Sequence, residues 1–496
     1  MRGAGASGGG SVRRAIVFLA ALITACRSSE DPRSSPAIQP SPCHLTGTAA
    51  QVVDAMCGSL RVPEDRNAKT GRTIDLAIAV VKATGRKASP DPLFLLAGGP
   101  GQSALDVYPT IAGSLARVNL TRDVVLVDQR GTGRSGALVC PQTEVEGTIV
   151  DPAAGAALAA RCRSELEKHA DLRHYTTAIA MDDLDDVRAA LGYETIDLYG
   201  GSYGTRAALV YLRRHEAHVR AVVLDGVAPP DWALAASFAE DGQRALDRIF
   251  ARCAADPDCN RAFPDLPASL RALLAAHDKP TEVIVSHPTT AAPTSVTVSS
   301  DSIAATLHAL SYESETAALL PLLIHSTAHT GDLRPLAAQS LIMADSLKLA
   351  VGEHFAVTCN EDAPFLDPAA IEAEGAKSYL GAAPARRYIE ACKGWPRATV
   401  TAEDRAPVRS NVPVLLLSGE NDPVTPPANA AAAARTLPNS AQVTVPGEGH
   451  GALQRSCTRR IASDFIERAS VAGLATDCLR DAKPMRFFTS FAGPQP

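Results

Sequence analysis

The stretch Gly200-Gly201-Ser202-Tyr203-Gly204 lies between an apolar run at residues 195–199 and a segment of helical character at residues 206–214. A serine between a strand and a helix, with glycine two positions before and two positions after it, is typical of a nucleophile elbow. The serine occupies a strained turn there, and glycine at the flanking positions avoids the crowded backbone. The sequence therefore predicts that Ser202 is the nucleophile of a serine hydrolase.

Two further residues are candidates for catalysis because each follows a predicted buried strand. Asp422 lies in a turn-rich segment after the apolar run 412–418, and His450 lies in a glycine-rich loop after residues 442–445. Open α/β sheets collect their functional residues at the carboxyl ends of the strands. The chain order serine, acid, histidine is that of α/β-hydrolases. We therefore predict that His450 takes the proton of Ser202 and that Asp422 orients the histidine and stabilises its charged form.

Two other carboxylates are alternatives for the acid. Glu420 lies closer than Asp422 to the end of the predicted strand, and Glu448 lies two positions before His450. A solvated loop position would account for Glu420 without any catalytic role. Asp422 is the preferred acid, and both glutamates stay open as alternatives.

The loop Gly98-Gly99-Pro100-Gly101 is the candidate oxyanion site. It follows the apolar run 91–97, which predicts another buried strand. In α/β-hydrolases one oxyanion donor is the amide after the nucleophile, here Tyr203, and the other comes from the loop after an early strand, here Gly99. Losing one such donor costs roughly 3–4 kcal/mol of transition-state stabilisation. A plain tight turn is the alternative, whereas a phosphate-binding loop is disfavoured because no Gly-Lys-Ser/Thr follows.

Four segments together resemble a known family. They are Gly98-Gly99-Pro100-Gly101, Asp128-Gln129-Arg130-Gly131-Thr132-Gly133-Arg134-Ser135, Gly200-Gly201-Ser202-Tyr203-Gly204 and Asp422-Pro423-Val424-Thr425-Pro426. The combination resembles the proline iminopeptidase and tripeptidyl aminopeptidase family of serine exopeptidases, over roughly residues 43–480. The resemblance implies an α/β-hydrolase fold with a mostly parallel central sheet, in which the loop at 128–135 shapes the floor of the site. Ala97 stands where many iminopeptidases carry histidine, which fits the tripeptidyl branch better.

An aminopeptidase also needs a carboxylate that binds the ammonium group of the substrate. The segment Cys359-Asn360-Glu361-Asp362 resembles the Cys-x-acid segment of the family. The resemblance implies that Glu361 is the first candidate for substrate binding and Asp362 the second. An exposed acidic turn is the alternative interpretation.

The motif spacing predicts an insertion in the fold. Ser202 and Asp422 lie 220 positions apart, far more than two strand–helix units require. Apolar residues at a spacing of three to four predict helices at 234–255 and 302–310, whereas alternation at 281–286 and 294–299 predicts a small hairpin. We expect a signal peptide at 1–25, a tether rich in serine and proline at 26–42, a hydrolase core at 43–230, a mainly helical cap at 231–405 and the second part of the core at 406–496.

Composition excludes several other functions. A formal charge of −6 and an isoelectric point near 6.1 give no indication of nucleic-acid binding. His325 and His329 have a spacing compatible with a metal, but no glutamate follows His325 as it does in zincins. They are better explained as cap-helix residues. We predict neither a metal nor a cofactor.

The first residues have the pattern of an export signal. Arg2, Arg13 and Arg14 precede an apolar stretch at 15–25, which is too short to span a membrane but suits a signal peptide. The stretch ends in Ile-Thr-Ala-Cys at 23–26, which resembles a bacterial lipoprotein box with Cys26 as the lipidated residue. We expect export to the bacterial cell envelope with a lipid anchor as the membrane contact, and secretion as a soluble protein is the alternative.

Cysteine parity agrees with this interpretation. The chain has 11 cysteines, and an odd number in an exported protein leaves one unpaired. Assigning Cys26 to lipid leaves ten. Sequence alone does not fix their connectivity, and the hypothesis is that nearest neighbours pair: Cys43/Cys57, Cys140/Cys162, Cys253/Cys259, Cys359/Cys392 and Cys457/Cys478. Such loops contribute roughly 2–4 kcal/mol each in the loop-entropy model, and disulfides indicate an oxidising compartment.

Three functions are compatible with these residues. The preferred one is an exported serine aminopeptidase that acts on peptides with a free amino terminus. A carboxylesterase or lipase shares the same triad and oxyanion site. A non-catalytic, ligand-binding hydrolase-fold protein is disfavoured because all three triad residues are present.

Overall fold

Continuous apolar runs form the centre of the sheet. β4 (Leu93–Leu96), β5 (Val124–Val127) and β10 (Val414–Gly419) are buried along their whole length, and β6 (Ile196–Gly201) is buried up to its last residue. Strands have such runs when helices cover both faces of a parallel sheet. The buried strands predicted from these runs are confirmed.

The computed structural model describes residues 38–492 except 48–49, 69, 141–151 and 347. Within that part of the chain the main sheet has nine strands, in the order β1-β2-β3-β5-β4-β6-β7-β10-β11. Neighbours from β5 to β11 are parallel, whereas β1, β2, β3 and β5 pair antiparallel. The remaining strands are β1 (Ser41–Thr46), β2 (Val52–Pro63), β3 (Thr73–Val81), β7 (Val219–Asp225) and β11 (Ser440–Val445).

The strand order reverses at β4. The next strand in the chain, β5, pairs with one side of β4, and β6 pairs with the other side. Ligands of open α/β sheets bind in the crevice beyond the carboxyl ends of the strands at such a reversal. The loop at 98–101 follows β4 and Ser202 follows β6, so the topology brings both to this position.

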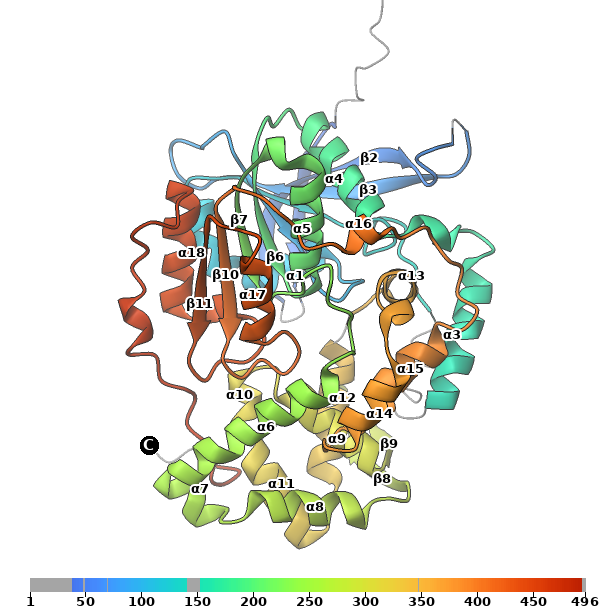
Figure 1. The fold of residues 1–496 in the computed structure, drawn as a ribbon, viewed down its shortest axis with the longest axis vertical. Helices are drawn as coiled ribbons and strands as arrows, with labels where there is room; N and C mark the ends of the chain where they lie inside the picture. The colour runs from blue at the N-terminus through green and yellow to red at the C-terminus, as the bar shows by residue number, and fades with distance from the viewer. Residues whose placement is uncertain (1–37, 48–49, 69, 141–151, 347, 493–496) are drawn as a thin grey trace, which may run out of the picture. The chain divides into compact units, whose positions relative to one another are not determined.

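Helices cover both faces of the sheet (Figure 1). On one face, α1 (Ala104–Asn119) and α18 (Ser456–Arg468) contribute side chains to a hydrophobic cluster. These side chains include Leu105, Tyr108 and Phe465. The cluster on the other face includes Leu184 and Leu209. It contains residues of α3 (Pro152–Leu166), α4 (Thr177–Ala190), α5 (Tyr203–His215) and α17 (Pro427–Ala434).

The segment predicted to be the cap, residues 231–405, lies in the sequence between β7 and β10. Its helices α6 to α12 lie below the arrowheads of β10 and β11 in Figure 1. They have a hydrophobic cluster of their own that includes Leu246, Leu307 and Ile324. In contrast, Val357 and Trp395 of the later cap segments belong to the cluster of the sheet. The predicted cap therefore has one part with its own core and another part that shares the core of the main sheet.

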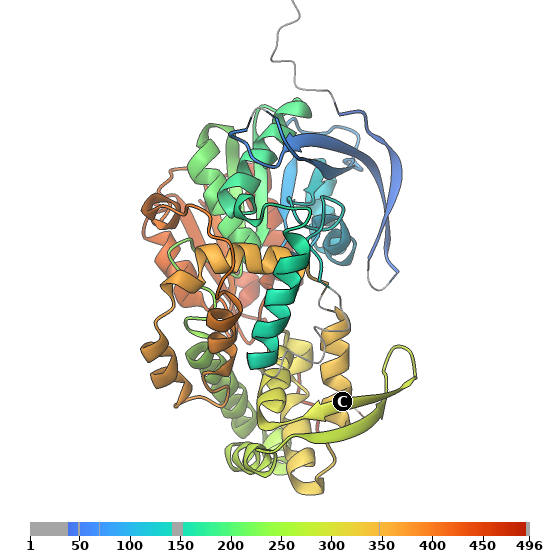
Figure 2. The same ribbon diagram turned by 90° about the vertical axis from the view of Figure 1, so that its right-hand side faces the viewer.

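The predicted hairpin of the cap is confirmed as the antiparallel pair β8 (Thr281–Ser286) and β9 (Pro293–Val298), which Figure 2 shows beside the cap helices. The cap helices are α6 (Phe238–Ala255), α7 (Pro257–Ala262), α8 (Leu266–Ala276), α9 (Ser300–Leu310), α10 (Ser314–Ala317), α11 (Leu320–Thr330), α12 (Arg334–Ser346), α13 (Val351–Glu361), α14 (Pro368–Gly375), α15 (Ala383–Ala391) and α16 (Ala402–Arg405). Short 3₁₀ helices are η1 (Leu172–His174), η2 (Glu216–His218), η3 (Ala363–Phe365), η4 (Ala452–Gln454) and η5 (Asp477–Leu479).

The predicted cysteine pairing is confirmed. In the described part of the chain, five disulfides join Cys43 to Cys57, Cys140 to Cys162, Cys253 to Cys259, Cys359 to Cys392 and Cys457 to Cys478. The Cys359–Cys392 bridge connects α13 with the end of α15, so it fixes two cap helices to each other. None of the helices in the described residues has the length and apolar character needed to cross a membrane.

The predicted signal peptide at 1–25, Cys26 and most of the predicted tether lie outside the described residues. The last two tether positions differ from the prediction. Ser41 and Pro42 belong to β1, where they pair with Cys57 and Met56 of β2.

Candidate active site

Ser202 occupies the turn between β6 and α5. Its backbone dihedrals are φ 56° and ψ −124°, a conformation that residues with a side chain rarely adopt. A Cβ on Gly200 would lie 2.2 Å from the carbonyl oxygen of Gly204, and a Cβ on Gly204 would lie 2.1 Å from that of Leu96. Both glycines are therefore required by backbone contact, as the elbow motif predicts.

Asp422 and His450 form a hydrogen-bonded pair. The Nδ1 atom of His450 lies 2.8 Å from Oδ2 of Asp422, which is fully buried. Burial opposes ionisation of both groups, but their mutual attraction and hydrogen bond outweigh it. The pKa of Asp422 is lowered and the pKa of His450 is raised. The pair is thus arranged to stabilise an imidazolium ion.

Ser202 and His450 both lie against the end of β7. The N–H of Ser202 donates to the carbonyl oxygen of Asp225 at 2.8 Å. A Cβ on the next residue, Gly226, would lie 3.0 Å from Cε1 of His450. No hydrogen bond joins Oγ of Ser202 to His450 among the described residues. Such contacts are often long without substrate and tighten in the complex.

Thr425 is a neighbour of the pair that the sequence analysis missed. Its hydroxyl lies 2.7 Å from Oδ2 of Asp422 and 3.0 Å from Nδ1 of His450. Its N–H also donates to Oδ1 of Asp422 at 2.8 Å, beside the N–H of Val424 at 2.9 Å. The available signal was the position three residues after an aspartate in a turn, where hydroxyl side chains bond locally.

Asp225 is a second residue that the sequence analysis missed. It ends β7, is almost fully buried, and accepts hydrogen bonds from the N–H groups of Ala452 and Leu453 at 2.7 and 3.0 Å. The hydroxyl of Tyr199 donates to it at 3.1 Å. Burial raises the pKa of Asp225. Asp225 thus connects the loop after His450 to the strand that contacts Ser202. The sequence signal for this residue is an acid at the end of an apolar run.

The residue before the predicted oxyanion donor Gly99 lies beside Ser202. A Cβ on Gly98 would lie 3.1 Å from Cβ of Ser202. Gly99 has φ 109°, which glycine adopts readily. Tyr203 is the first residue of α5, so its N–H has no acceptor within the helix. Amide donors at Gly99 and Tyr203 would suit a developing negative charge.

The two alternative acids have other partners. Glu420 is half exposed; its carboxylate lies 2.8 Å from Nη1 of Arg248 and accepts the N–H of Gly447 at 3.0 Å. Glu448 is buried and forms an ion pair with Arg455. Of the three carboxylates considered, Asp422 is the one that is hydrogen-bonded to the imidazole.

Comparison with known proteins agrees with this geometry. Residues 91–305 match the family described as alpha/beta hydrolase fold, and residues 377–478 match the family described as TAP-like protein. The chain has the α/β-hydrolase fold. The first match contains the elbow at Ser202, and the second contains Asp422 and His450.

Relatives of this chain include named peptidases. The chain is 31% identical over 252 residues to serine protease Hip1 of Mycobacterium tuberculosis, and the match covers 46% of this chain and 47% of that protein. It is 35% identical over 191 residues to tripeptidyl aminopeptidase of Streptomyces coelicolor, covering 35% of each. The matched region thus spans about half or less of the length of these relatives.

A third relative has a different name, and the solved structures are more distant. Carboxylesterase B of Mycobacterium tuberculosis is 29% identical over 234 residues, covering 42% of this chain and 44% of that protein. The proline iminopeptidase of Mycobacterium smegmatis, a solved structure, is 17% identical with a TM-score of 0.39, covering 84% of this chain and 99% of that one.

The acidic segment of the hydrolase is buried rather than exposed. Glu361 accepts the N–H and the hydroxyl of Thr177, both at 2.7 Å, and the same hydroxyl lies 2.7 Å from the hydroxyl of Tyr203. Asp362 accepts from Arg206 and from the N–H of Leu234, both at 2.9 Å. The interpretation as an exposed acidic turn is therefore wrong. Glu361 is connected to the residue next to Ser202, whereas Asp362 neutralises a buried arginine.

Glu353 is a third buried carboxyl group near this segment. It lies eight positions before Glu361 on α13, on the same helix face, and its Oε2 atom has no hydrogen-bond partner in the described part of the chain. A Cβ on Gly131 would lie 2.5 Å from that oxygen. Burial, opposed by Arg130 and reinforced by Glu361, raises the pKa of Glu353 well above its usual value. The spacing of eight was the missed signal.

The loop at 128–135 is held by buried polar contacts. Asp128 accepts the hydroxyl of Ser103 at 2.7 Å and the N–H of Arg134 at 2.8 Å. Arg130 is fully buried and forms a bidentate pair with Asp183 at 2.6 and 2.8 Å. These contacts fix the Gly131 backbone, so the loop forms a rigid wall beside Glu353.

Two groups of side chains have a spacing compatible with metal ligands. His325 and His329 lie on α11, and Nδ1 of His329 bonds to the carbonyl oxygen of His325 instead of facing a shared site. The second group in the described residues is Asp185, His215 and His218. Asp185 already accepts from Arg188 at 2.7 Å and from Tyr211 at 2.8 Å. An ion would have to displace both, so we assign no metal to this group.

Proposed function

We propose that this hydrolase is an exported serine aminopeptidase that removes single residues or short peptides from free peptide amino termini. The observation that carries the proposal is the buried Glu361, which is connected through Thr177 to Tyr203, the residue after the nucleophile. An aminopeptidase needs a carboxylate that binds the ammonium group of the substrate at a set distance from the nucleophile. An enzyme that recognises only the acyl group needs no such carboxylate.

In the proposed reaction, Oγ of Ser202 attacks the scissile carbonyl carbon and His450 accepts the serine proton. Asp422 keeps Nδ1 of His450 as the hydrogen-bonded atom and stabilises the imidazolium ion. The amides of Tyr203 and Gly99 donate to the oxyanion. His450 then returns the proton to the leaving amine, and a water molecule hydrolyses the acyl-enzyme through the same steps.

Substrate recognition is assigned to Glu361, together with Glu353. Burial raises the pKa of both carboxyl groups. An incoming ammonium group would supply the positive charge that favours their ionised forms. Asp362 was the second candidate, but it already pairs with Arg206 at 2.9 Å, so we give it a structural role. The distance from these carboxylates to Ser202 sets how many residues are released.

The proposal includes export and a lipid anchor on Cys26. The five disulfides support it because such bonds persist in oxidising compartments. Expression of Cys26→Ser in the native host tests the anchor. The variant is expected in the soluble fraction after cell lysis, and its retention in the membrane fraction would contradict lipidation.

A carboxylesterase is the second candidate function. One relative is named carboxylesterase B, and an esterase needs the same triad and oxyanion donors. The two functions differ in whether the substrate must carry a free ammonium group.

Hydrolysis of coumarin amides separates the two functions. The panel contains aminoacyl, dipeptidyl and tripeptidyl coumarins, each with a free and an acetylated amino terminus, together with a short-chain ester. An aminopeptidase loses activity on acetylation, and the preferred length reports the distance from Ser202 to the ammonium site. Equal activity on acetylated substrates, or turnover of the ester alone, would reject the aminopeptidase in favour of the esterase.

A further inference from the structure

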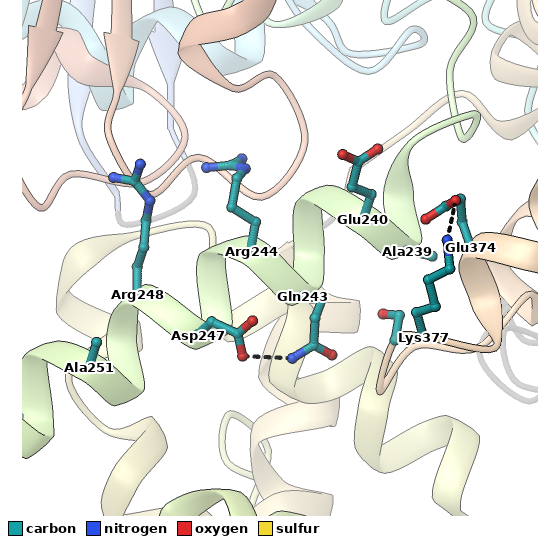
Figure 3. A pocket seen from close by; sticks show the side chains of 10 residues that line it. Ala239, Glu240, Gln243, Arg244, Asp247, Arg248, Ala251, Glu374 and Lys377 are labelled. Atoms are coloured by element: carbon teal, nitrogen blue, oxygen red, sulfur yellow. Dashed lines mark hydrogen bonds and ion pairs between the residues drawn. The ribbon is translucent and has the colours of Figure 1, made fainter.

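Two segments of the cap contact the loops that carry Asp422 and His450. The first is helix α6, from which Arg244 and Arg248 extend on one side along a cavity of about 490 Å³ (Figure 3). The second is the turn after α9, which contains Tyr312. These contacts connect an inserted element to both loops of the acid–histidine pair.

Arg244 binds the backbone of the catalytic acid. Its Nη2 atom donates to the carbonyl oxygen of Asp422 at 2.7 Å, and Nη1 lies 3.5 Å from the carbonyl oxygen of Glu420. Asp241, one turn earlier on α6, lies 3.4 Å from the same guanidinium group and holds it in place. Hydrogen bonds from a charged donor are stronger than those between neutral groups, so this contact fixes the main chain at Asp422.

The carboxylate of Asp422 has no further freedom of its own. Each of its oxygens accepts two hydrogen bonds, which come from the N–H groups of Val424 and Thr425, the hydroxyl of Thr425 and the ring of His450. Three of the four donors belong to the loop of the acid itself. The carboxylate therefore moves with its backbone, and a shift of that backbone changes the distance between Asp422 and His450.

The cap also holds the histidine loop. The N–H of His450 donates to the carbonyl oxygen of Tyr312 at 2.5 Å, and the two rings meet edge to face at 5.4 Å between centroids. The two cap segments are joined because a Cβ on Gly242 of α6 would lie 3.1 Å from the ring of His308 on α9. One packed unit thus contacts the acid on one side and the histidine on the other.

We propose that Arg244 is a positioning residue for catalysis, which keeps Asp422 in hydrogen-bonding register with His450 by binding the backbone carbonyl of the acid. The cap then contributes to proton transfer as well as to substrate access. This inference rests on the proposed function, since it presumes that Ser202 is activated by His450.

Arg248 provides a matched control on the same helix. It lies one turn after Arg244 and pairs with the carboxylate of Glu420 at 2.8 Å, with both side chains about half exposed. Exposed ion pairs contribute little to stability. Loss of Arg248 removes a cap arginine of equal charge that contacts the same loop but not the backbone of Asp422.

The test compares purified Arg244→Gln, Arg244→Lys and Arg248→Gln with the unchanged chain. The probe is a fluorophosphonate, in which Oγ of Ser202 displaces fluoride from phosphorus while its proton passes to His450. The labelling rate is measured from pH 5 to pH 9. The titratable groups around the histidine are Asp422, Asp225, Glu313, His308 and Tyr312.

We expect Arg244→Gln to label about tenfold or more slowly, with the acid limb of its pH profile displaced to lower pH. The direction in which the acid limb moves is informative. A weaker contact with Asp422 lowers the pKa of His450, whereas simple removal of a nearby positive charge would raise it. Arg244→Lys keeps a charged donor and should recover much of the rate, and Arg248→Gln should label within about twofold of the unchanged chain.

Three results would overturn the inference. They are an unchanged labelling rate in Arg244→Gln, a limb displaced to higher pH, and an equal loss in Arg248→Gln. Thermal melting shows whether Arg244→Gln is folded. If it is not, Arg244→Lys decides, because a partly kept contact predicts a small displacement of the acid limb to lower pH, and an undisplaced limb would overturn the inference. If the unchanged chain does not react with the probe at all, the proposed function fails instead.

Discussion

Asp422 and Glu353 are two buried carboxyl groups whose surroundings are opposite. Asp422 is buried and accepts four hydrogen bonds, one of them from His450, and its pKa is lowered. Glu353 is also buried, but one of its oxygens has no hydrogen-bond partner among the described residues, and its pKa is raised well above normal. Burial is common to both, so hydrogen bonds and charge decide which acid stays ionised.

Glu361 lies between these extremes. Thr177 donates to both of its oxygens, yet burial still raises its pKa, and the nearest guanidinium nitrogen of Arg206 lies 3.9 Å away. A carboxylate with all partners inside the protein serves a permanent structure such as the Asp422–His450 pair. A carboxyl group that lacks a full set of partners is suited to a ligand that brings the missing charge. The predictions below test this distinction.

The largest expected effect is that of Asp422→Asn. The amide cannot stabilise an imidazolium ion, and it lets His450 adopt the wrong tautomer, so kcat should fall by roughly 10⁴-fold with little change in KM. Steady-state hydrolysis of a tripeptidyl coumarin measures both. Glu420→Gln, in the same loop, is the control and should stay within about threefold. A larger loss in Glu420→Gln than in Asp422→Asn would reassign the acid.

The second prediction concerns Glu361→Gln. The glutamine keeps a hydrogen-bond acceptor for Thr177 but carries no charge, so KM for free-amine peptides should rise by about 100-fold, as expected when one partner of a buried charge pair is lost. Activity toward an acetylated or ester substrate should not change. Glu372→Gln is the matched control, because Glu372 is an exposed cap acid that pairs with Arg386.

The pH dependence of KM sharpens the same prediction. The pKa of Glu361 is raised, so its carboxylate becomes neutral at a higher pH than an ordinary glutamate as the solution is acidified. In the unchanged chain KM for a free-amine peptide should therefore rise as pH falls through this raised pKa. In Glu361→Gln that rise should vanish. A pH dependence that is unchanged in the variant would show that another group binds the ammonium ion.

The candidate triad could be predicted from the sequence because each member has a local signal. Ser202 has flanking glycines, and Asp422 and His450 each follow a buried apolar run. The parallel sheet then brings the three loops to one edge. The sequence does not separate Asp422 from Glu420, since the two differ by only two positions and no pattern shows which carboxylate faces the histidine.

Contacts between distant segments could not be predicted in this way. Arg206 and Asp362 are 156 positions apart, and Arg244 and Asp422 are 178 apart. Neither pair has a local pattern, so the sequence leaves Asp362 as a candidate for substrate binding and does not single out Arg244. The division of the predicted cap into two parts could not be predicted for the same reason. Val357 and Trp395 join the core of the main sheet through packing that no sequence periodicity encodes.

The smallest expected effect concerns stability, and it separates the two kinds of buried acid directly. Glu353→Met removes an unpaired buried oxygen and should stabilise the fold at pH 8 by about 1–3 kcal/mol, measured by urea unfolding. A group whose pKa is raised on folding favours the folded state at low pH and loses that contribution as pH rises through the raised pKa. The gain should therefore be smaller at pH 5, where the carboxyl group is neutral. Destabilisation of the variant at pH 8 would show that Glu353 has a partner in the folded protein and would remove the contrast with Asp422.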